Sequence, residues 1–122
     1  MAGVETTVLS RGVVARVSGD MDYMTRPGLW ERFGQLLVGD GAFIVLDLSG
    51  VAFCDSAGLN LLLRAHREAE LGGVELVLAW VPQPLRRIVE MTGADQILRI
   101  YDTVEAAQEA LDDRGDAAGR LG

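Results

Sequence analysis

The chain has 122 residues, 49% of them hydrophobic, which suits a single folded domain and excludes disorder as the dominant state. Eighteen acidic residues against eleven basic ones, all of them arginine, give a net charge of −7, and the phosphate backbone of a nucleic acid would repel such a chain. One cysteine excludes an internal disulfide, and no run approaches the ~20 apolar residues of a membrane helix, so we expect a cytoplasmic protein without a membrane partner.

The first third of the chain predicts a hairpin and a helix. Residues 4–9 and 13–18 favour β-structure, and residues 10–12, Ser-Arg-Gly, place a glycine in the turn between them. A polar loop follows at residues 19–22, and Pro27 then suits the first turn of a helix. The apolar face of that helix is formed by Leu29, Phe33, Leu36 and Leu37.

The middle of the chain predicts a buried strand and a second helix. Residues 42–48 form a nearly unbroken apolar run, which is typical of a strand covered on both faces or at the centre of a sheet. Asp55 and Ser56 offer capping side chains for the next helix, which ends at Gly72 and Gly73. The apolar positions of this helix are Leu59, Leu62, Leu63, His66 and Ala69.

The last third continues the alternation of strands and helices. Residues 74–80 predict a strand, and residues 84–93 predict a helix that proline opens and glycine ends. Residues 97–101 predict a last short strand, and Thr103 caps a terminal helix that extends to residue 111.

The predicted order of elements is β-β-α-β-α-β-α-β-α, which is an α/β arrangement. Strands that alternate with helices imply parallel crossovers, so we expect one mixed β-sheet, opened by the hairpin, with helices packed mainly on one face. The polar, glycine-rich end of the chain is expected to be disordered. We therefore predict a single domain over residues 1–111 and a disordered C-terminal tail over residues 112–122.

The segment most suggestive of function is residues 53–59, Phe-Cys-Asp-Ser-Ala-Gly-Leu, which leads from a buried strand into a helix. A helix start exposes unpaired N–H groups and the positive end of the dipole, so it tolerates an added phosphate. Ser56 places a hydroxyl at this point. Simple capping of the helix by Asp55 or Ser56 explains the same residues, and both interpretations remain open.

A serine-hydrolase interpretation fails on two counts. Cys54, Ser56 and Gly58 follow the spacing of a nucleophile elbow, but cysteine stands where that motif has its first glycine. The one histidine, His66, lies ten residues further into the same helix, about 15 Å along its axis, where it cannot act as the base. Cys54 also has no cationic neighbour in the sequence that would activate its thiol. We therefore expect no serine catalysis.

A receiver domain has a similar length and alternation, with Asp47 as the candidate phosphoacceptor. Such domains also need an acidic pair directly after the first strand and a late lysine, whereas here Asp20 and Asp22 follow a hairpin and the chain has no lysine. These three carboxylates and Asp55 are ligand types for a hard cation. Loop acids more often cap turns or face solvent, so we expect no metal and no cofactor.

Several segments, in the right order and spacing, resemble the STAS domain, as found in bacterial anti-sigma factor antagonists. Residues 55–59, Asp-Ser-Ala-Gly-Leu, following residues 44–49, resemble the signature of the family, and residues 19–22, Gly-Asp-Met-Asp, match its Gly-(Glu/Asp)-x-Asp loop. Its closing pattern is similar to residues 89–95 and 100–107. The resemblance covers residues 4 to 111 and implies a STAS-type fold.

This resemblance implies a non-enzymatic switch that regulates transcription. An unphosphorylated member binds an anti-sigma factor, itself a serine kinase of the histidine-kinase-like ATPase type, and thereby frees a sigma factor. The kinase then phosphorylates the motif serine, here Ser56, and the complex dissociates until a phosphatase restores the hydroxyl. Many substrates in the family carry a second Ser or Thr where this chain has Ala57, which leaves one acceptor in the loop.

The loop after the second strand and the start of the helix at Ser56 follow strands expected to be parallel neighbours, so both should leave the sheet at one edge. The predicted partner-binding residues are Asp20, Met21, Asp22, Met24, Asp55, Ser56, Ala57, Gly58 and Leu59, with the two methionines supplying apolar contact. The alternative is a STAS-fold small-molecule or nucleotide-binding module, with a pocket between Asp20 and Ser56, or a stress-signalling scaffold. The chain has no Walker or dinucleotide phosphate loop and no lysine to neutralise a triphosphate.

Overall fold

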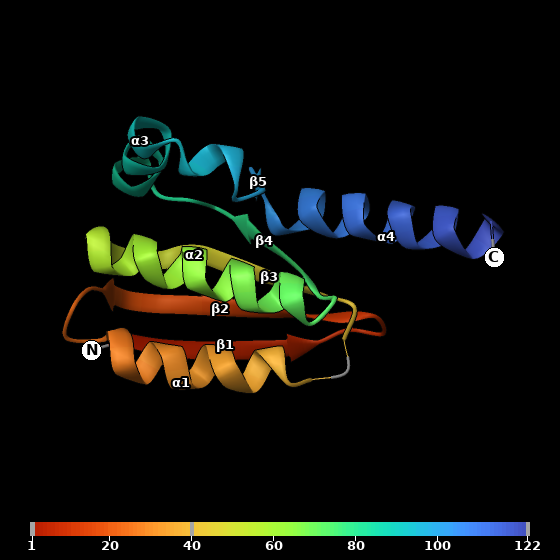
Figure 1. Ribbon diagram of the computed structural model, residues 1–122, viewed down its shortest axis with the longest axis horizontal. Coiled ribbons are helices and arrows are strands. Elements are labelled where there is room, and N and C mark those ends of the chain that lie inside the picture. The colour runs from red at the N-terminus through yellow and green to blue at the C-terminus, as the bar shows by residue number, and fades with distance from the viewer. Residues whose placement is uncertain (1, 40, 122) are drawn as a thin grey trace.

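The computed structural model describes the backbone of residues 2–39 and 41–121, and their side chains through residue 112. A five-stranded sheet carries its strands in chain order (Figure 1). The first pair is antiparallel, and every later pair of neighbours is parallel. The strands are β1 (Ala2–Val8), β2 (Gly12–Met21), β3 (Phe43–Cys54), β4 (Glu75–Ala79) and β5 (Ile100–Tyr101).

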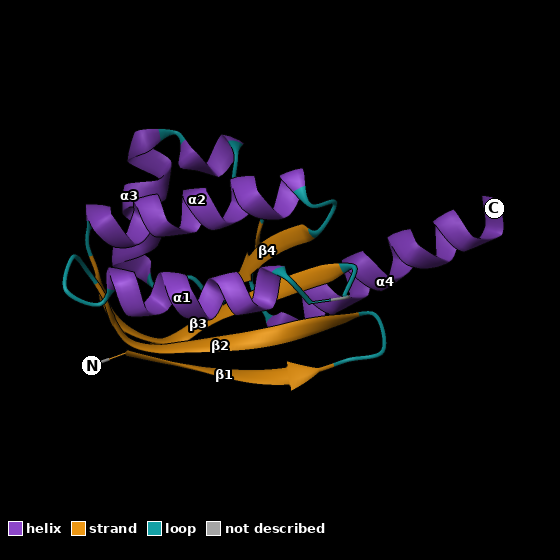
Figure 2. Ribbon diagram, turned by 60° about the horizontal axis from the view of Figure 1, so that its bottom comes forward, coloured by secondary structure: helices purple, strands orange, loops and turns teal. Residues whose placement is uncertain are grey.

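The sequential strand order decides where the helices lie. Three helices connect successive parallel strands: α1 (Arg26–Leu37), α2 (Ser56–Leu71) and α3 (Gln83–Thr92). Each new strand is added at the same edge of the sheet, so right-handed crossovers place all three helices on the same face. Figure 2 shows α1 and α2 side by side over that face. α4 (Val104–Leu121) follows the last strand and packs against the other face. The prediction of one mixed sheet with helices mainly on one face is confirmed.

Each face of the sheet has its own apolar core, and β3 contributes to both. Ile44 and Leu46 pack in the larger core on the side of α1, α2 and α3, while Phe43 and Val45 pack in a smaller one beneath α4. This two-sided burial explains the unbroken apolar run that marks the strand in the sequence. Within the described residues, no helix has the length and apolar character needed to cross a membrane.

Local signals in the sequence mark several helix ends correctly. Pro27 lies in the first turn of α1, and Asp55 caps the start of α2. Gly93 ends α3 with a left-handed φ of 78°, a conformation in which any other side chain would be strained. At the start of α4, the Thr103 hydroxyl oxygen accepts a hydrogen bond from the Ala106 N–H at 3.0 Å.

The central strands extend further than the sequence predicts. A polar loop was expected at residues 19–22, but β2 continues to Met21 and β3 to Cys54. The two extensions pair with each other: Asp20 is opposite Phe53 and Met21 is opposite Cys54, beyond two shifts of register. This pairing holds polar and glycine residues in an extended conformation that local propensity alone would assign to a loop.

The C-terminal elements also differ in length from the prediction. The last strand was predicted over residues 97–101 and is limited to Ile100–Tyr101. A 3₁₀ helix at Ala94–Gln96 precedes it, and Ile97 N and Leu98 N still donate to the Ala94 carbonyl oxygen in the turn that follows this helix. α4 extends to Leu121, beyond the predicted helix end at residue 111. The predicted disorder over residues 112–122 stays a prediction, and residue 122 lies outside the described residues. Residues 112–121 hold two alanines, two arginines and a leucine, which are strong helix formers, and the three aspartates and two glycines among them do not end the helix. The domain boundary at residue 111 stays a prediction.

Candidate phosphorylation and partner-binding site

The ends of β2 and β3 bring two loops together. Met21 and Cys54 are register partners in the parallel pair, and the Asp55 N–H donates a hydrogen bond to the Met21 carbonyl at 3.3 Å. The β2–α1 loop and the start of α2 therefore leave the sheet at one edge, as expected for parallel neighbours. We call this edge, residues 20–25 and 53–59, the α2 edge.

Asp55 is the residue that caps α2. Its backbone is extended, with φ −106° and ψ −168°, and its Oδ1 accepts hydrogen bonds from Ala57 N at 2.9 Å and Gly58 N at 3.1 Å. These bonds satisfy two of the N–H groups that a helix start leaves without partners. Ser56 follows as the first residue of α2, and it is exposed. The capping interpretation therefore belongs to Asp55, and the Ser56 hydroxyl has no capping role.

Gly58 holds the first turn of α2 against the sheet. A Cβ at this position would overlap the Met21 carbonyl oxygen and lie 2.5 Å from Cys54 Sγ. Real side chains do not approach other atoms that closely, so only glycine lets the helix pack directly on the ends of β2 and β3. The glycine thus fixes the position of Ser56 relative to the neighbouring loop.

The β2–α1 loop is closed by its own hydrogen bonds. Asp22 Oδ1 accepts from the N–H groups of Met24 at 2.9 Å and Thr25 at 3.0 Å. The Thr25 hydroxyl donates to the Asp20 carbonyl oxygen at 2.8 Å, and the Asp22 N–H donates to that hydroxyl at 3.0 Å. This is an Asx-type turn in which the Asp22 carboxylate is engaged within the loop. Asp22 therefore stabilises the conformation of the β2–α1 loop at the α2 edge.

Large apolar side chains at the α2 edge face solvent. Tyr23 is 68% exposed, Met24 is 81% exposed and Phe53 is 55% exposed. Exposed aromatic and methionine side chains that lie close together are typical of protein interfaces. Met24 was predicted as a contact residue, whereas Tyr23 and Phe53 were not. Tyr23 lies between two predicted contact residues, and Phe53 lies two residues before Asp55. Aromatic residues are enriched in protein interfaces, so their position beside the predicted residues could have identified both.

Some of the predicted contact residues are buried. The Met21 side chain is 0% exposed and belongs to the core beneath α1 and α2, and Leu59 and Gly58 are buried as well. Met21 does not offer the predicted apolar contact, because β2 continues through it and directs the side chain inward. Ser56 and Met24 are exposed, and the remaining predicted residues, Asp20, Asp22, Asp55 and Ala57, are half-buried.

Cys54 and His66 are the two side chains that a hydrolase interpretation would need beside Ser56. Burial, and secondarily the charge of Asp55, raises the pKa of the Cys54 thiol to about 11, so the thiol is protonated and unreactive at neutral pH. His66 lies 3.7 Å from Glu70 on the next turn of α2, far along the helix from Ser56. Among the described residues, no three His, Cys, Asp or Glu side chains gather in a way that would hold a metal ion.

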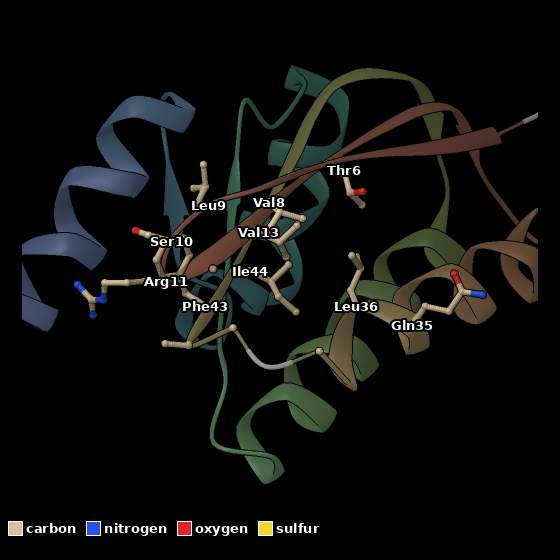
Figure 3. A pocket seen from close by; sticks show the side chains of 14 residues that line it. Thr6, Val8, Leu9, Ser10, Arg11, Val13, Gln35, Leu36, Phe43 and Ile44 are labelled. Carbon is tan, nitrogen blue, oxygen red and sulfur yellow. The ribbon is translucent and has the colours of Figure 1, made fainter.

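A sizeable hollow lies at the opposite end of the sheet. It has a volume of about 580 Å³, and Figure 3 shows Val8, Val13 and Ile44 on the strands with Gln35 and Leu36 of α1 across from them. Neither Asp20 nor Ser56 lines it. The small-molecule alternative requires a pocket between those two residues, and this hollow is separated from them by most of the length of β3.

Comparisons with known proteins agree with the fold and the motifs. Residues 4–107 match the STAS domain. The anti-sigma F factor antagonist of Paenibacillus polymyxa is 31% identical over 94 residues, which cover 75% of this chain and 80% of that protein. The anti-sigma-B factor antagonist of Listeria monocytogenes is 32% identical over 84 residues, 69% of this chain and 74% of that protein.

A solved structure of an anti-sigma factor antagonist has the same fold. The crystal structure of an anti-sigma factor antagonist from Mycobacterium paratuberculosis superimposes with a TM-score of 0.82 at 25% sequence identity, covering 90% of this chain and 93% of that one. Sequence motifs, strand order and helix placement all point to one family. The chain belongs to the STAS domain family.

Proposed function

We propose that this protein is an anti-sigma factor antagonist that is switched off by phosphorylation of Ser56. In its unphosphorylated form it binds an anti-sigma factor that is also an ATPase-type serine kinase, and a sigma factor is freed for transcription. The kinase transfers a phosphoryl group from ATP to the Ser56 hydroxyl, and a phosphatase later removes it. The three relatives described above are named as anti-sigma factor antagonists, and those names support this class of partner.

One observation carries the proposal: Ser56 is exposed at the first position of α2 while Asp55 makes the capping hydrogen bonds. A kinase can reach this hydroxyl without breaking any bond that holds the helix start. Ala57, the next residue, has no hydroxyl that would compete. The chain supplies the acceptor atom and the docking surface, and the catalytic groups belong to the kinase.

A phosphate at Ser56 acts on the interface rather than on the fold. It adds roughly −1.5 to −2 charge beside the Asp55 carboxylate. The positive end of the helix dipole at the start of α2 stabilises negative charge, so the domain keeps its structure. A partner packed on this edge must instead strip water from a dianion, which is costly without a matching cation. Phosphorylation therefore separates the two proteins.

The exposed apolar side chains at the same edge supply the attraction that the phosphate opposes. Tyr23, Met24 and Phe53 expose apolar surface at the α2 edge, which also holds Ser56. The hydrogen bonds of Asp22 keep the loop that carries Tyr23 and Met24 in a fixed shape. A preorganised loop loses little conformational entropy when a partner binds. A kinase that docks on these side chains also brings its active site to the serine.

The test is to map phosphate on the protein purified from its native host. Peptide mass spectrometry should find one phosphate, on Ser56, and none in a strain that carries Ser56→Ala. Ser49→Ala is the matched control, because Ser49 is also exposed on β3 but lies away from the helix start, and it should not change the phosphorylation. A phosphate on Ser49, Thr92 or Thr103 that persists in Ser56→Ala would refute the proposed site.

A further inference from the structure

We propose that a groove between α1 and α2 binds an acidic segment of a partner protein. The proposal rests on the proposed function for the identity of that partner, and it adds the chemistry of the segment. The groove has a volume of about 390 Å³ and lies beside the α2 edge. We call it the arginine groove, and it is lined by Arg26, Pro27, Trp30, Asn60, Leu61 and Arg64.

Both arginines of the groove are held by aromatic rings. The guanidinium carbon of Arg64 lies 3.9 Å from the centre of the Trp30 ring, and that of Arg26 lies 5.3 Å from the centre of the Tyr23 ring. Stacking fixes the plane of a guanidinium and leaves its N–H donors at the edge free to bind a carboxylate with two bonds. The two side chains are thus positioned before any ligand arrives.

Neither of these arginines forms an ion pair with a side chain in the described part of the chain. Other arginines do: Arg99 lies 2.7 Å from Glu75, and Arg86 lies 3.6 Å from Asp102. The chain carries a net charge of −7, yet the groove that these two arginines line has no acidic residue in its lining. Their charges are complementary to an acidic ligand.

The arginine groove is continuous with the phosphorylation site. Ser56, Asn60 and Arg64 are spaced four residues apart, so they follow one another along the same face of α2. The N-termini of α1 and α2 add the positive ends of their dipoles at this side of the molecule. A phosphate at Ser56 has the same sign as an acidic segment in the groove and competes for the same positive field. The groove therefore gives phosphorylation a second means of releasing the partner.

The groove contains a built-in reporter, because Trp30 lines it and the protein has one other tryptophan, Trp80. In a Trp80→Phe background, a hexaglutamate peptide should change the fluorescence of Trp30 saturably at low ionic strength. Hexalysine should not. The affinity for hexaglutamate should fall at least about tenfold in Arg26→Gln/Arg64→Gln, and it should fall with added salt. Ser56→Asp should also weaken it.

Arg87→Gln is the matched control, because Arg87 is exposed on α3 outside the groove, and it should bind hexaglutamate like the parent protein. Equal binding by the double variant, or no saturable binding to the parent, would overturn the proposal. Equally tight binding of a decathymidine oligonucleotide would overturn it in favour of a general polyanion site. If the double variant fails to fold, Arg26→Gln alone decides the question. None of these results depends on whether Ser56 is phosphorylated in the cell.

Discussion

Replacing Asp55 with alanine should separate helix capping from signalling. The substitution removes the carboxylate oxygen that accepts two hydrogen bonds, from Ala57 N at 2.9 Å and Gly58 N at 3.1 Å. Loss of an N-cap costs about 1–2 kcal/mol, which for a domain of this size corresponds to a decrease in Tm of about 4–8 °C. Ser56→Ala removes an exposed hydroxyl with no capping role, so the free energy of unfolding should change by less than about 0.5 kcal/mol.

Urea and thermal unfolding of the two variants beside the parent protein would measure this difference. Asp55→Asn is the control, because asparagine caps a helix about as well as aspartate while it removes the charge, and it should stay close to the parent. If Ser56→Ala destabilises the protein as much as Asp55→Ala does, the serine shares the capping role and the assignment of the cap to Asp55 is wrong. An unchanged Tm for Asp55→Ala would contradict it equally.

Three further predictions follow from the same edge of the sheet. Gly58→Ala should destabilise the domain by more than about 2 kcal/mol in urea unfolding, because the added Cβ has no room. Gly34→Ala, on α1, is the control: its Cβ enters open space, so it should be neutral or stabilising by up to about 1 kcal/mol. Met24→Ser should leave Tm unchanged and weaken calorimetric binding to the anti-sigma factor; an unchanged affinity would place the interface elsewhere. Burial raises the pKa of the Cys54 thiol from 9.0 to about 11, so the folded state holds this proton more tightly, and the free energy of unfolding should fall as pH rises from 9 to 11. Cys54→Ala should remove that part of the pH dependence.

The sequence predicts the elements of this fold well where the signals are local. Pro27, Asp55 and Gly93 mark helix ends through the chemistry of their own backbone or side chain, and the structure places each one as expected. The apolar run of β3 also identifies a central strand, since burial on both faces leaves no polar positions. The hairpin and the alternation of strands and helices also predict one mixed sheet, whereas the strand order comes from the structure.

Features that depend on distant partners could not be predicted in the same way. The ends of β2 and β3 are strands because they pair with each other, although each contains a Ser-Gly pair, at residues 18–19 and 49–50, that local propensity would assign to a turn. Met21 was expected in a surface loop and lies in the core, because β2 continues through it with the same alternation that buries Ala15 and Val17. The exposure of Tyr23 and Phe53, and the stacking of Arg64 on Trp30, arise from tertiary packing.

The affinity of the anti-sigma factor kinase for Ser56→Ala and Ser56→Asp tests the proposed switch most directly. By isothermal titration calorimetry, Ser56→Ala should bind like the unphosphorylated parent, and ATP should release the parent but not this variant. Ser56→Asp should keep the Tm of the parent, because a carboxylate suits a helix N-terminus, and should bind at least about tenfold more weakly. If Ser56→Asp binds as tightly as the parent, negative charge at Ser56 does not control the interface and the proposed switch is contradicted.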